Sequence, residues 1–552
     1  MSDYQLFWGD LHSHCSISYG HGTVEQALAR AKQQLDFCSV TGHAFWPDMP
    51  TDRAAYGEII DYHNDGFATL ASNWDELIRL QDAGTTDGEF IAFPSYEWHS
   101  LKYGDHNVYS PGPELVRRDA ADLPQLREVV KQAESIAIPH HIGYRKGYRG
   151  INWDEYSPEV SPFVEVFSLH GCSVSDDAAY PMLHDMGPRD YGSTAEAGWD
   201  LGHQFGIVGG TDHHAAYPGS HGDGRMGVFA KELTRESLWE AFLARRVYAA
   251  TGDQIDARLF VEDAGIGETC AARRQRTVRA TVRGVDALEK VEIFKNDRLI
   301  KRLFPEPEEA PSGRSRFRLR ITWGWGRNTF PAKWDCRLSL SDGIIHDIET
   351  CFSGQAIVAP KGTSGVEELS DHDDLPHELI EHGERSCVWR SVTQGNKSMR
   401  HETMQALSLD LETRLIDTIT IEANGQTFQY QLGELFHRSR AHFLRGWLTE
   451  AMRIGPLVTE TECTLRTEFK DQGSTATDRY RLQVAQKNGQ WAWLTPIWVN
   501  SRQRRDNPPR RKKRGRGRPG DGSPVGSGNR PKQPDLTTAK RVRKTKRKTK
   551  VK

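Results

Sequence analysis

Short apolar runs alternate with amphipathic stretches along residues 1–255. The runs read YQLFWGD, FCSVTGH, EFIAFPSYEW, SIAIPHH, FVEVFSLHG and FGIVGGTDHH, and they end on polar side chains. Residues 23–36 and 123–134 between them are predicted helices, the first with a capping box formed by Thr23 and Gln26. Runs of β-type residues that alternate with helices are typical of parallel strands joined by crossover helices. We therefore expect an α/β domain here.

The pattern changes to strict alternation after Gly252. RTVRATVRGV, KVEIFKNDRLI and SRFRLRITWGWG alternate apolar and polar positions, as half-buried strands do. Residues 256–385 are therefore predicted as a β-sandwich-like domain, and residues 386–500 as a β-rich α+β domain with one helix over residues 439–454. Four dipeptides predict tight turns between strands: Asn296-Asp297, Asp342-Gly343, Asn424-Gly425 and Asn488-Gly489.

Charge divides the chain into an acidic body and a basic tail. The formal net charge of the whole chain is −3, yet residues 501–552 hold 21 Lys and Arg against three Asp. That segment has no Phe, Tyr or Trp and is rich in Pro and Gly. It cannot bury a core, so we expect it to be disordered. Basic blocks of this kind suit a polyanion, and non-specific nucleic acid is the partner we expect.

Targeting signals are absent from the sequence pattern. No run of about 18 apolar residues occurs, which predicts no transmembrane segment, and no basic region precedes an apolar stretch at the N-terminus. The eight cysteines are scattered without a Cys-x-x-Cys pair, which favours reduced thiols. We expect a cytoplasmic protein, and the sequence indicates no particular oligomeric state.

Histidine and carboxylate side chains gather where the predicted strands end. A His-x-His pair puts both rings on one face of a strand, because strand side chains alternate with a period of two. Asp212 and His214 have the same spacing. Imidazole and carboxylate together suit Zn²⁺, Mn²⁺ or Fe²⁺. The strand-end positions are His12, His14, His43, Glu97, His140, Asp212 and His214. This ordered set predicts a metal site.

The order of these motifs resembles the PHP (polymerase and histidinol phosphatase) superfamily of metal-dependent phosphoesterases. The motifs are DLHSH, VTGH, YEWH, GDHNVY, IPHH and GTDHH, within residues 5–255. The resemblance is closest to a largely uncharacterised subfamily that opens with GDLHxH. It implies a distorted (β/α)7 barrel with two or three clustered divalent metal ions (Mn, Zn or Fe), followed here by β-rich domains and the tail.

The resemblance also implies roles for individual residues. His12, His14, Glu97 and Asp212 would hold a first metal, and Glu97 would bridge to a second with His106 and His140. A third would be held by His21, His43 and His214. This chain departs from the family pattern at two positions: Gly42 replaces an Asp, and His141 replaces a Pro.

A metal-dependent phosphoesterase is the function we expect, with a phosphomonoester or phosphodiester as substrate. Two adjacent cations can activate water and neutralise phosphoryl charge, so no covalent nucleophile is needed. Glu97 and Asp212 are the expected catalytic carboxylates. Loop cations could contact phosphate, and they are Arg145, Lys146, Arg149 and Arg225. Two alternatives remain: an amidohydrolase-like metal-dependent hydrolase, and a nucleic-acid-binding protein built on a degenerate PHP scaffold.

The basic tail yields a first testable prediction. Deleting residues 501–552 should abolish binding to single- and double-stranded DNA, because the tail carries the cationic blocks PPRRKKRGRGRP and KRVRKTKRKTKVK. Binding by the full chain should ignore base sequence and weaken steeply with salt. Anisotropy titrations of both proteins at several salt concentrations measure this, with anionic lipid vesicles as the competing polyanion. Equal affinity of the two proteins would show that the tail is not the anchor.

Overall fold

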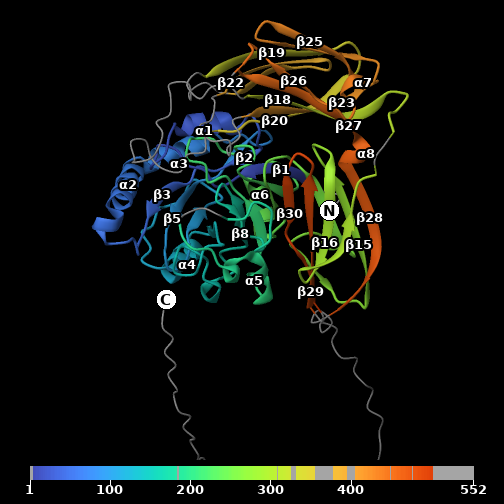
Figure 1. Ribbon diagram of the computed structural model, residues 1–552. Helices are drawn as coiled ribbons and strands as arrows, with labels where there is room; N and C mark the ends of the chain where they lie inside the picture. Colours follow the sequence, from blue (N-terminus) through green and yellow to red (C-terminus); the bar gives the residue numbers. More distant parts are fainter. Residues whose placement is uncertain are drawn as a thin grey trace, which may run out of the picture. The chain divides into compact units, whose positions relative to one another are not determined.

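The computed structural model describes residues 4–182, 186–306, 309–324, 331–354, 377–393, 404–447, 449–474 and 477–500 (Figure 1). The predicted disordered tail lies outside these residues. Every helix in these residues is too short or too polar to span a bilayer. They form a mixed α/β structure that is rich in strands and has few helices, which confirms the α/β class.

Parallel strand pairs occur where the N-terminal pattern predicts them. They are formed by β1 (Gln5–Asp10) with β2 (Phe37–Cys38), β2 with β4 (Ile91–Ala92), β3 (Gly42–Phe45) with β5 (Ser95–Trp98), and β8 (Phe163–Ser168) with β10 (Gly206–Gly209). The helices of this region are α1 (Val24–Ala31), α2 (Arg53–Ser72), α3 (Trp74–Ala83), α4 (Leu123–Gln132), α5 (Ala195–Asp200) and α6 (Arg235–Leu243). The predicted capping box is present, since the backbone N–H of Gln26 donates to Thr23 Oγ1 at 3.2 Å and the backbone N–H of Thr23 donates to Gln26 Oε1 at 2.9 Å.

A (β/α)7 barrel is not evident among the described residues, which corrects the predicted fold. Several neighbours run antiparallel instead: β1 with β11 (Arg225–Ala230), β11 with β12 (Val247–Ala250), β5 with β6 (His106–Tyr109), β6 with β7 (Ile136–Pro139), and β8 with β9 (Gly171–Cys172). The connection from β5 to β6, residues 99–105, is too short for the crossover of about a dozen residues that a parallel pair needs. Hydrophobic periodicity identifies a strand but does not give its direction.

Two five-stranded sheets enclose the largest apolar cluster of the C-terminal half. One contains β20 (Ile344–Cys351), β23 (Gln405–Thr413), β18 (Ser315–Gly324), β27 (Ala451–Thr459) and β26 (Arg440–Phe443). The other contains β21 (Glu378–His382), β22 (Ser386–Thr393), β19 (Ala332–Leu340), β24 (Thr418–Ala423) and β25 (Gln426–Gln431). Trp323 of the first sheet packs on Trp389 of the second, with ring centroids 5.4 Å apart. Strands from both sides of residue 385 share these sheets, and the division of the chain at residues 255, 385 and 500 stays a prediction.

Further strands link the C-terminal residues to the N-terminal sheet. β13 (Asp256–Val261), β15 (Gln275–Arg283) and β28 (Thr464–Gln472) form one sheet. β12 continues through β30 (Trp491–Leu494) into a set formed by β29 (Thr477–Gln486), β31 (Ile497–Asn500), β14 (Thr269–Ala271), β16 (Leu288–Lys295) and β17 (Arg298–Leu303). The remaining two α-helices among the described residues are short, α7 (Leu432–Leu435) and α8 (Glu460–Cys463).

Three of the four predicted turns join paired strands, but two local predictions are wrong. Asp342-Gly343 joins β19 to β20, which lie in different sheets. The helix predicted over residues 439–454 is replaced by β26 and the start of β27. Gly446 has a φ of 112°, which a helix cannot contain, and Met452 and Ile454 are buried on either side of exposed Arg453. That burial has the period of a strand.

The fully buried Asp253 is a hydrogen-bond centre for segments far apart in the sequence. Its carboxylate accepts from His221 Nε2 at 2.7 Å and from the side-chain amides of Gln486 and Asn488, each at 2.6 Å. Arg320 Nη1 of β18 lies 3.2 Å away. Burial opposes the charged form of Asp253, but Arg320 and His221 hold its pKa well below its usual range. This carboxylate therefore ties β18 and the β29–β30 turn to the end of the N-terminal sheet.

We expect Asp253→Asn to lower the free energy of unfolding by about 3 kcal/mol, because it leaves the Arg320 cation without its buried partner. Asp335→Asn is the matched control, since that carboxylate is 73% exposed. Urea unfolding followed by circular dichroism measures both variants. Equal, small losses in the two variants would contradict the structural role of Asp253.

Candidate metal centre

Asp10, the last residue of β1, fixes the frame of the site. Its fully buried carboxylate accepts from the backbone N–H groups of His12 at 2.9 Å, Thr211 at 3.1 Å and Gly219 at 2.8 Å. Thr211 Oγ1 also donates to it at 2.6 Å. These bonds join the end of β1 to the loop that follows β10. The His-x-His and Asp-x-His motifs therefore face each other.

The two facing motifs meet at the Asp212 carboxylate. His12 Nε2 lies 3.2 Å and His14 Nε2 lies 3.1 Å from Asp212 Oδ1. The ring of His214 lies 4.3 Å from that of His14, centroid to centroid. Asp212 has a φ of 55°, in the left-handed region that non-glycine residues adopt rarely and that recurs at functional sites.

Glu97 of β5 lies at the centre of the histidines. Its Oε2 lies 3.0 Å from His43 Nδ1 and 3.4 Å from His14 Nε2. Its Oε1 lies 3.0 Å from His140 Nε2 and 3.3 Å from His99 Nδ1. The residue is only 2% exposed. Burial opposes ionisation, but His99, His43 and His140 hold the pKa of Glu97 well below its usual range.

Further side chains orient the rings around this carboxylate. His12 Nδ1 bonds to Glu165 Oε2 at 2.8 Å, and His14 Nδ1 bonds to the carbonyl of Thr41. Burial lowers the pKa of His12, yet the carboxylates of Glu165 and Asp212 overcome this and raise it to about 10. In both rings the Nδ1 contact leaves Nε2 turned toward the centre. A partner on the distal nitrogen is the usual support of a metal-binding histidine.

Divalent ions fit this donor set. Several buried atoms have no hydrogen-bond partner among the described residues: His12 Nε2, His43 Nε2, Glu97 Oε2, His140 Nδ1 and His141 Nδ1. The separations of 3.0–3.4 Å match the edges of about 3.3 Å expected when ligands lie about 2.0–2.1 Å from an ion in a tetrahedral site. Imidazole and carboxylate donors suit Zn²⁺, Mn²⁺ and Fe²⁺. The groups that could hold an ion include His14-His43-His214, His12-His14-Glu97, His43-Glu97-His99, Asp105-His140-His141 and His141-His170-Asp212.

Most of the predicted ligands come together in this cluster. The structure gathers His12, His14, His43, Glu97, His140, Asp212 and His214. His21 lies beside it, since its backbone N–H donates to the carbonyl of His214 at 2.8 Å and its side chain is buried. The ligand roles of these residues stay predictions.

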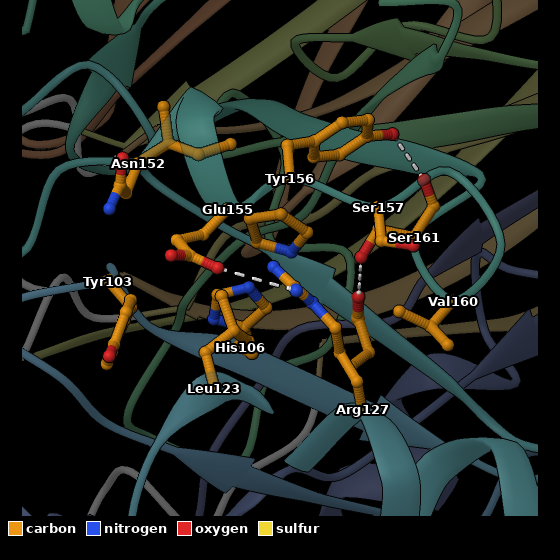
Figure 2. Close-up of a pocket in the computed structure, with 13 residues that line it drawn as sticks. Tyr103, His106, Leu123, Arg127, Asn152, Glu155, Tyr156, Ser157, Val160 and Ser161 are labelled. Carbon is orange, nitrogen blue, oxygen red and sulfur yellow. Dashed lines mark hydrogen bonds and ion pairs between the residues drawn. The ribbon is translucent and has the colours of Figure 1, made fainter. Parts of the chain in front are cut away.

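His106 is not brought to the cluster. It stands opposite Trp98 in the β5–β6 ladder, so its side chain shares the face of Trp98 and lies on the other side of the sheet from Glu97. Its Nδ1 bonds to the carbonyl of Gly104 at 2.9 Å. Figure 2 shows its ring in a separate pocket beside Arg127 and Glu155. The implied role of His106 as a ligand to the second metal does not agree with this placement.

Two of the arginines that were expected to contact phosphate, Arg225 and Arg145, do not face the cluster. Arg225 is fully buried, where its Nε donates to the carbonyl of Gly219 at 3.0 Å and its Nη2 to Gln34 Oε1 at 2.8 Å. It supports the loop that follows Asp212 and does not face the histidines. Arg145 is 53% exposed and lies 3.7 Å from Asp190.

Sequence reasoning missed several residues of the cluster. The sequence motifs give no role to His99 or Asp105, although Glu97-x-His99 has the same spacing as the other two motifs. Arg149, considered only as a loop cation, reaches the cluster: its Nε donates to Asp105 Oδ2 at 2.7 Å and its Nη2 lies 3.0 Å from His99 Nδ1. His170 Nε2 lies 2.7 Å from Asp212 Oδ2. His170 lies in VEVFSLHG, a segment that resembles the subfamily, and Asp105 lies in the motif GDHNVY, but the resemblance gives neither residue a role.

Known proteins and protein families match only part of the chain. A family model described as a protein of unknown function (DUF3604) matches residues 219–287. Uncharacterized proteins of Chlamydia pneumoniae and Chlamydia trachomatis serovar D are 25% identical over 323 residues and 24% identical over 325 residues. Each match covers 54% of this chain and 49% of the relative, so the chain spans about half the length of these relatives.

One solved structure shows a distant likeness. It is the crystal structure of a two-domain protein from Bacteroides vulgatus that contains a predicted PHP-like metal-dependent phosphoesterase. The TM-score is 0.30 at 16% identity, over 53% of this chain and 80% of that chain.

The cluster predicts the metal content of the purified protein. After incubation with Mn²⁺ or Zn²⁺ and removal of free metal, the wild type should retain about two or more ions per chain. The double variant His12→Ala/His14→Ala should retain less than about one, because both rings meet at Asp212. His437→Ala/His442→Ala, which removes two histidines of the C-terminal strands, is the matched control. Elemental analysis measures the metal content of all three proteins. Equal metal content in the two double variants would contradict the assignment of His12 and His14 to a metal site.

Proposed function

We propose that this chain is a metal-dependent phosphoesterase. The observation that carries the proposal is the buried Glu97 carboxylate, which has His14 and His43 on one oxygen and His99 and His140 on the other. A carboxylate placed in this way can bridge two ions. Bound divalent ions would activate a water molecule and neutralise charge that develops on phosphoryl oxygens.

The protein's own groups hold and orient this centre. Asp212 and Glu97 supply negative charge, and His12 and His14 present Nε2 because Glu165 and the Thr41 carbonyl occupy their Nδ1 atoms. Burial of all these side chains excludes bulk water, which strengthens each electrostatic contact. The arrangement therefore suits hydrolysis by a metal-activated water molecule, without a covalent nucleophile.

Arg149 supports a phosphoester as the substrate. Its side chain is only 11% exposed, and its guanidinium lies 5.1 Å from the centre of the Trp46 ring. Asp105 accepts from the Nε–H, whereas Nη1 donates to the weak acceptor Sδ of Met186 at 3.5 Å. A fixed guanidinium beside the histidines can donate to a phosphoryl oxygen. We assign phosphate contact to Arg149 in place of Arg145 and Arg225.

The proposed activity is tested with metal-stripped protein to which Mn²⁺, Zn²⁺ or Fe²⁺ is added. A panel of nucleotides, sugar phosphates, a phosphodiester and single- and double-stranded DNA should contain at least one substrate. Glu97→Gln should lower kcat/KM by about 100-fold or more, because the neutral amide cannot bridge two cations. Glu155→Gln is the matched control, since that residue lies in the pocket of Figure 2.

Two results would contradict the phosphoesterase proposal. One is activity that survives chelation of the metals. The other is hydrolysis of amides with no hydrolysis of any phosphoester, which would favour the amidohydrolase-like alternative. Binding of nucleic acid by the basic tail is a separate proposal, and the tail-deletion experiment tests it independently.

A further inference from the structure

We propose that His99 is a metal ligand, which completes a site with His43 and Glu97. The inference rests on the metal-binding part of the proposed function and does not depend on the identity of the substrate. Nothing in the family pattern quoted above gives His99 a role.

Strand geometry puts His99 on the side of the cluster. The backbone N–H of His99 donates to the carbonyl of Phe45 at 2.8 Å, which extends the pairing of β5 with β3 by one residue. Side chains alternate along a strand, so Glu97 and His99 share one face while Trp98 takes the other. The Glu-x-His pair has the same spacing as His12-x-His14 and Asp212-x-His214.

The distances among the three residues suit a shared ion. His99 Nε2 lies 3.2 Å from His43 Nδ1, and that nitrogen lies 3.0 Å from Glu97 Oε2. Ligands about 2.0–2.1 Å from a tetrahedral ion are about 3.3 Å apart. All three side chains are buried, at 0–2% exposure. Glu97 Oε2 has no hydrogen-bond partner among the residues that the structure describes, so a cation between these groups would satisfy it.

A separate set of contacts orients the His99 ring. Its Nδ1 lies 3.0 Å from Arg149 Nη2, 3.3 Å from Glu97 Oε1 and 3.7 Å from Asp105 Oδ2. Asp105 is fully buried and is itself held by the Ser100 backbone N–H at 2.8 Å and by Arg149. Asp105 therefore holds in place the Arg149 guanidinium that contacts this nitrogen. Asp105 is thus a positioning residue for His99.

The ring of His43 is fixed independently. Tyr19 stacks on it with centroids 3.6 Å apart and an interplanar angle of 3°. The Tyr19 hydroxyl lies 3.2 Å from His63 Nε2, and His63 Nδ1 donates to the carbonyl of Ile59 at 2.8 Å. His63 is therefore a buried histidine close to His99, with ring centroids 5.5 Å apart, whose two nitrogens are already engaged. It provides a matched control.

The test compares the metal content of His99→Ala, His63→Ala and His106→Ala with that of the wild type. Each protein is loaded with Zn²⁺ or Mn²⁺, freed of excess metal and measured by elemental analysis. We expect His99→Ala to lose about one equivalent, whereas the other two variants keep the full content. Full metal content in His99→Ala, or an equal loss in His63→Ala, would overturn the proposal.

A second variant reports metal coordination directly through its absorption spectrum. It also tests the proposal if His99→Ala folds poorly. His99→Cys loaded with Co²⁺ should gain a thiolate-to-cobalt charge-transfer band in the near ultraviolet, because a Cys thiolate is a good ligand for such ions. The band should be missing from the wild type and from His63→Cys. Folded His99→Cys that binds Co²⁺ without this band would overturn the proposal.

These readouts separate the inference from the proposed activity. A wild type that binds metal and hydrolyses no phosphoester would refute the phosphoesterase proposal and leave His99 as a ligand. Conversely, an active phosphoesterase whose His99→Ala variant keeps every ion would refute the role of His99 alone.

Discussion

The rest of the site depends on one buried carboxylate. An ionised Glu97 at 2% exposure would cost several kcal/mol without compensation, so the surrounding structure must supply positive or polarisable groups. Four elements do this at once: His14 follows β1, His43 lies in β3, His99 follows β5 and His140 follows β7. The ends of these strands therefore have to meet at one point, whatever the connections between them.

The buried carboxylates of this region differ in the groups that they contact, and therefore in their roles. Asp10 is saturated by backbone N–H groups and Thr211, so it holds two chain segments together and has no capacity left for an ion. Glu97 and Asp212 face imidazole nitrogens, which suits metal binding. Glu165 and Asp105 stand behind histidine rings and orient them. The surrounding contacts, and not the residue type, decide which carboxylates could act as ligands.

Short-range rules predicted the parts of the site that depend on one strand alone. The period of two gave the His12/His14 and Asp212/His214 pairs, and the same rule applied to Glu97 would have found His99. The face of His106 could not be predicted, because it depends on the register that sets it opposite Trp98 across the 99–105 connection. The barrel prediction failed for a related reason, since strand direction is decided by long-range pairing. The helix prediction for residues 439–454 is wrong for a local reason, because Gly446 has a positive φ that a helix cannot contain.

The central claim is that Glu97 lies between two metal ions. Anomalous diffraction from crystals of the wild-type protein grown with Mn²⁺ or Zn²⁺ tests it most directly. We predict two anomalous peaks, each about 2.0–2.2 Å from a different oxygen of Glu97, one beside His14 or His43 and one beside His140. Crystals saturated with metal that show no anomalous peak within bonding distance of Glu97 would contradict this account.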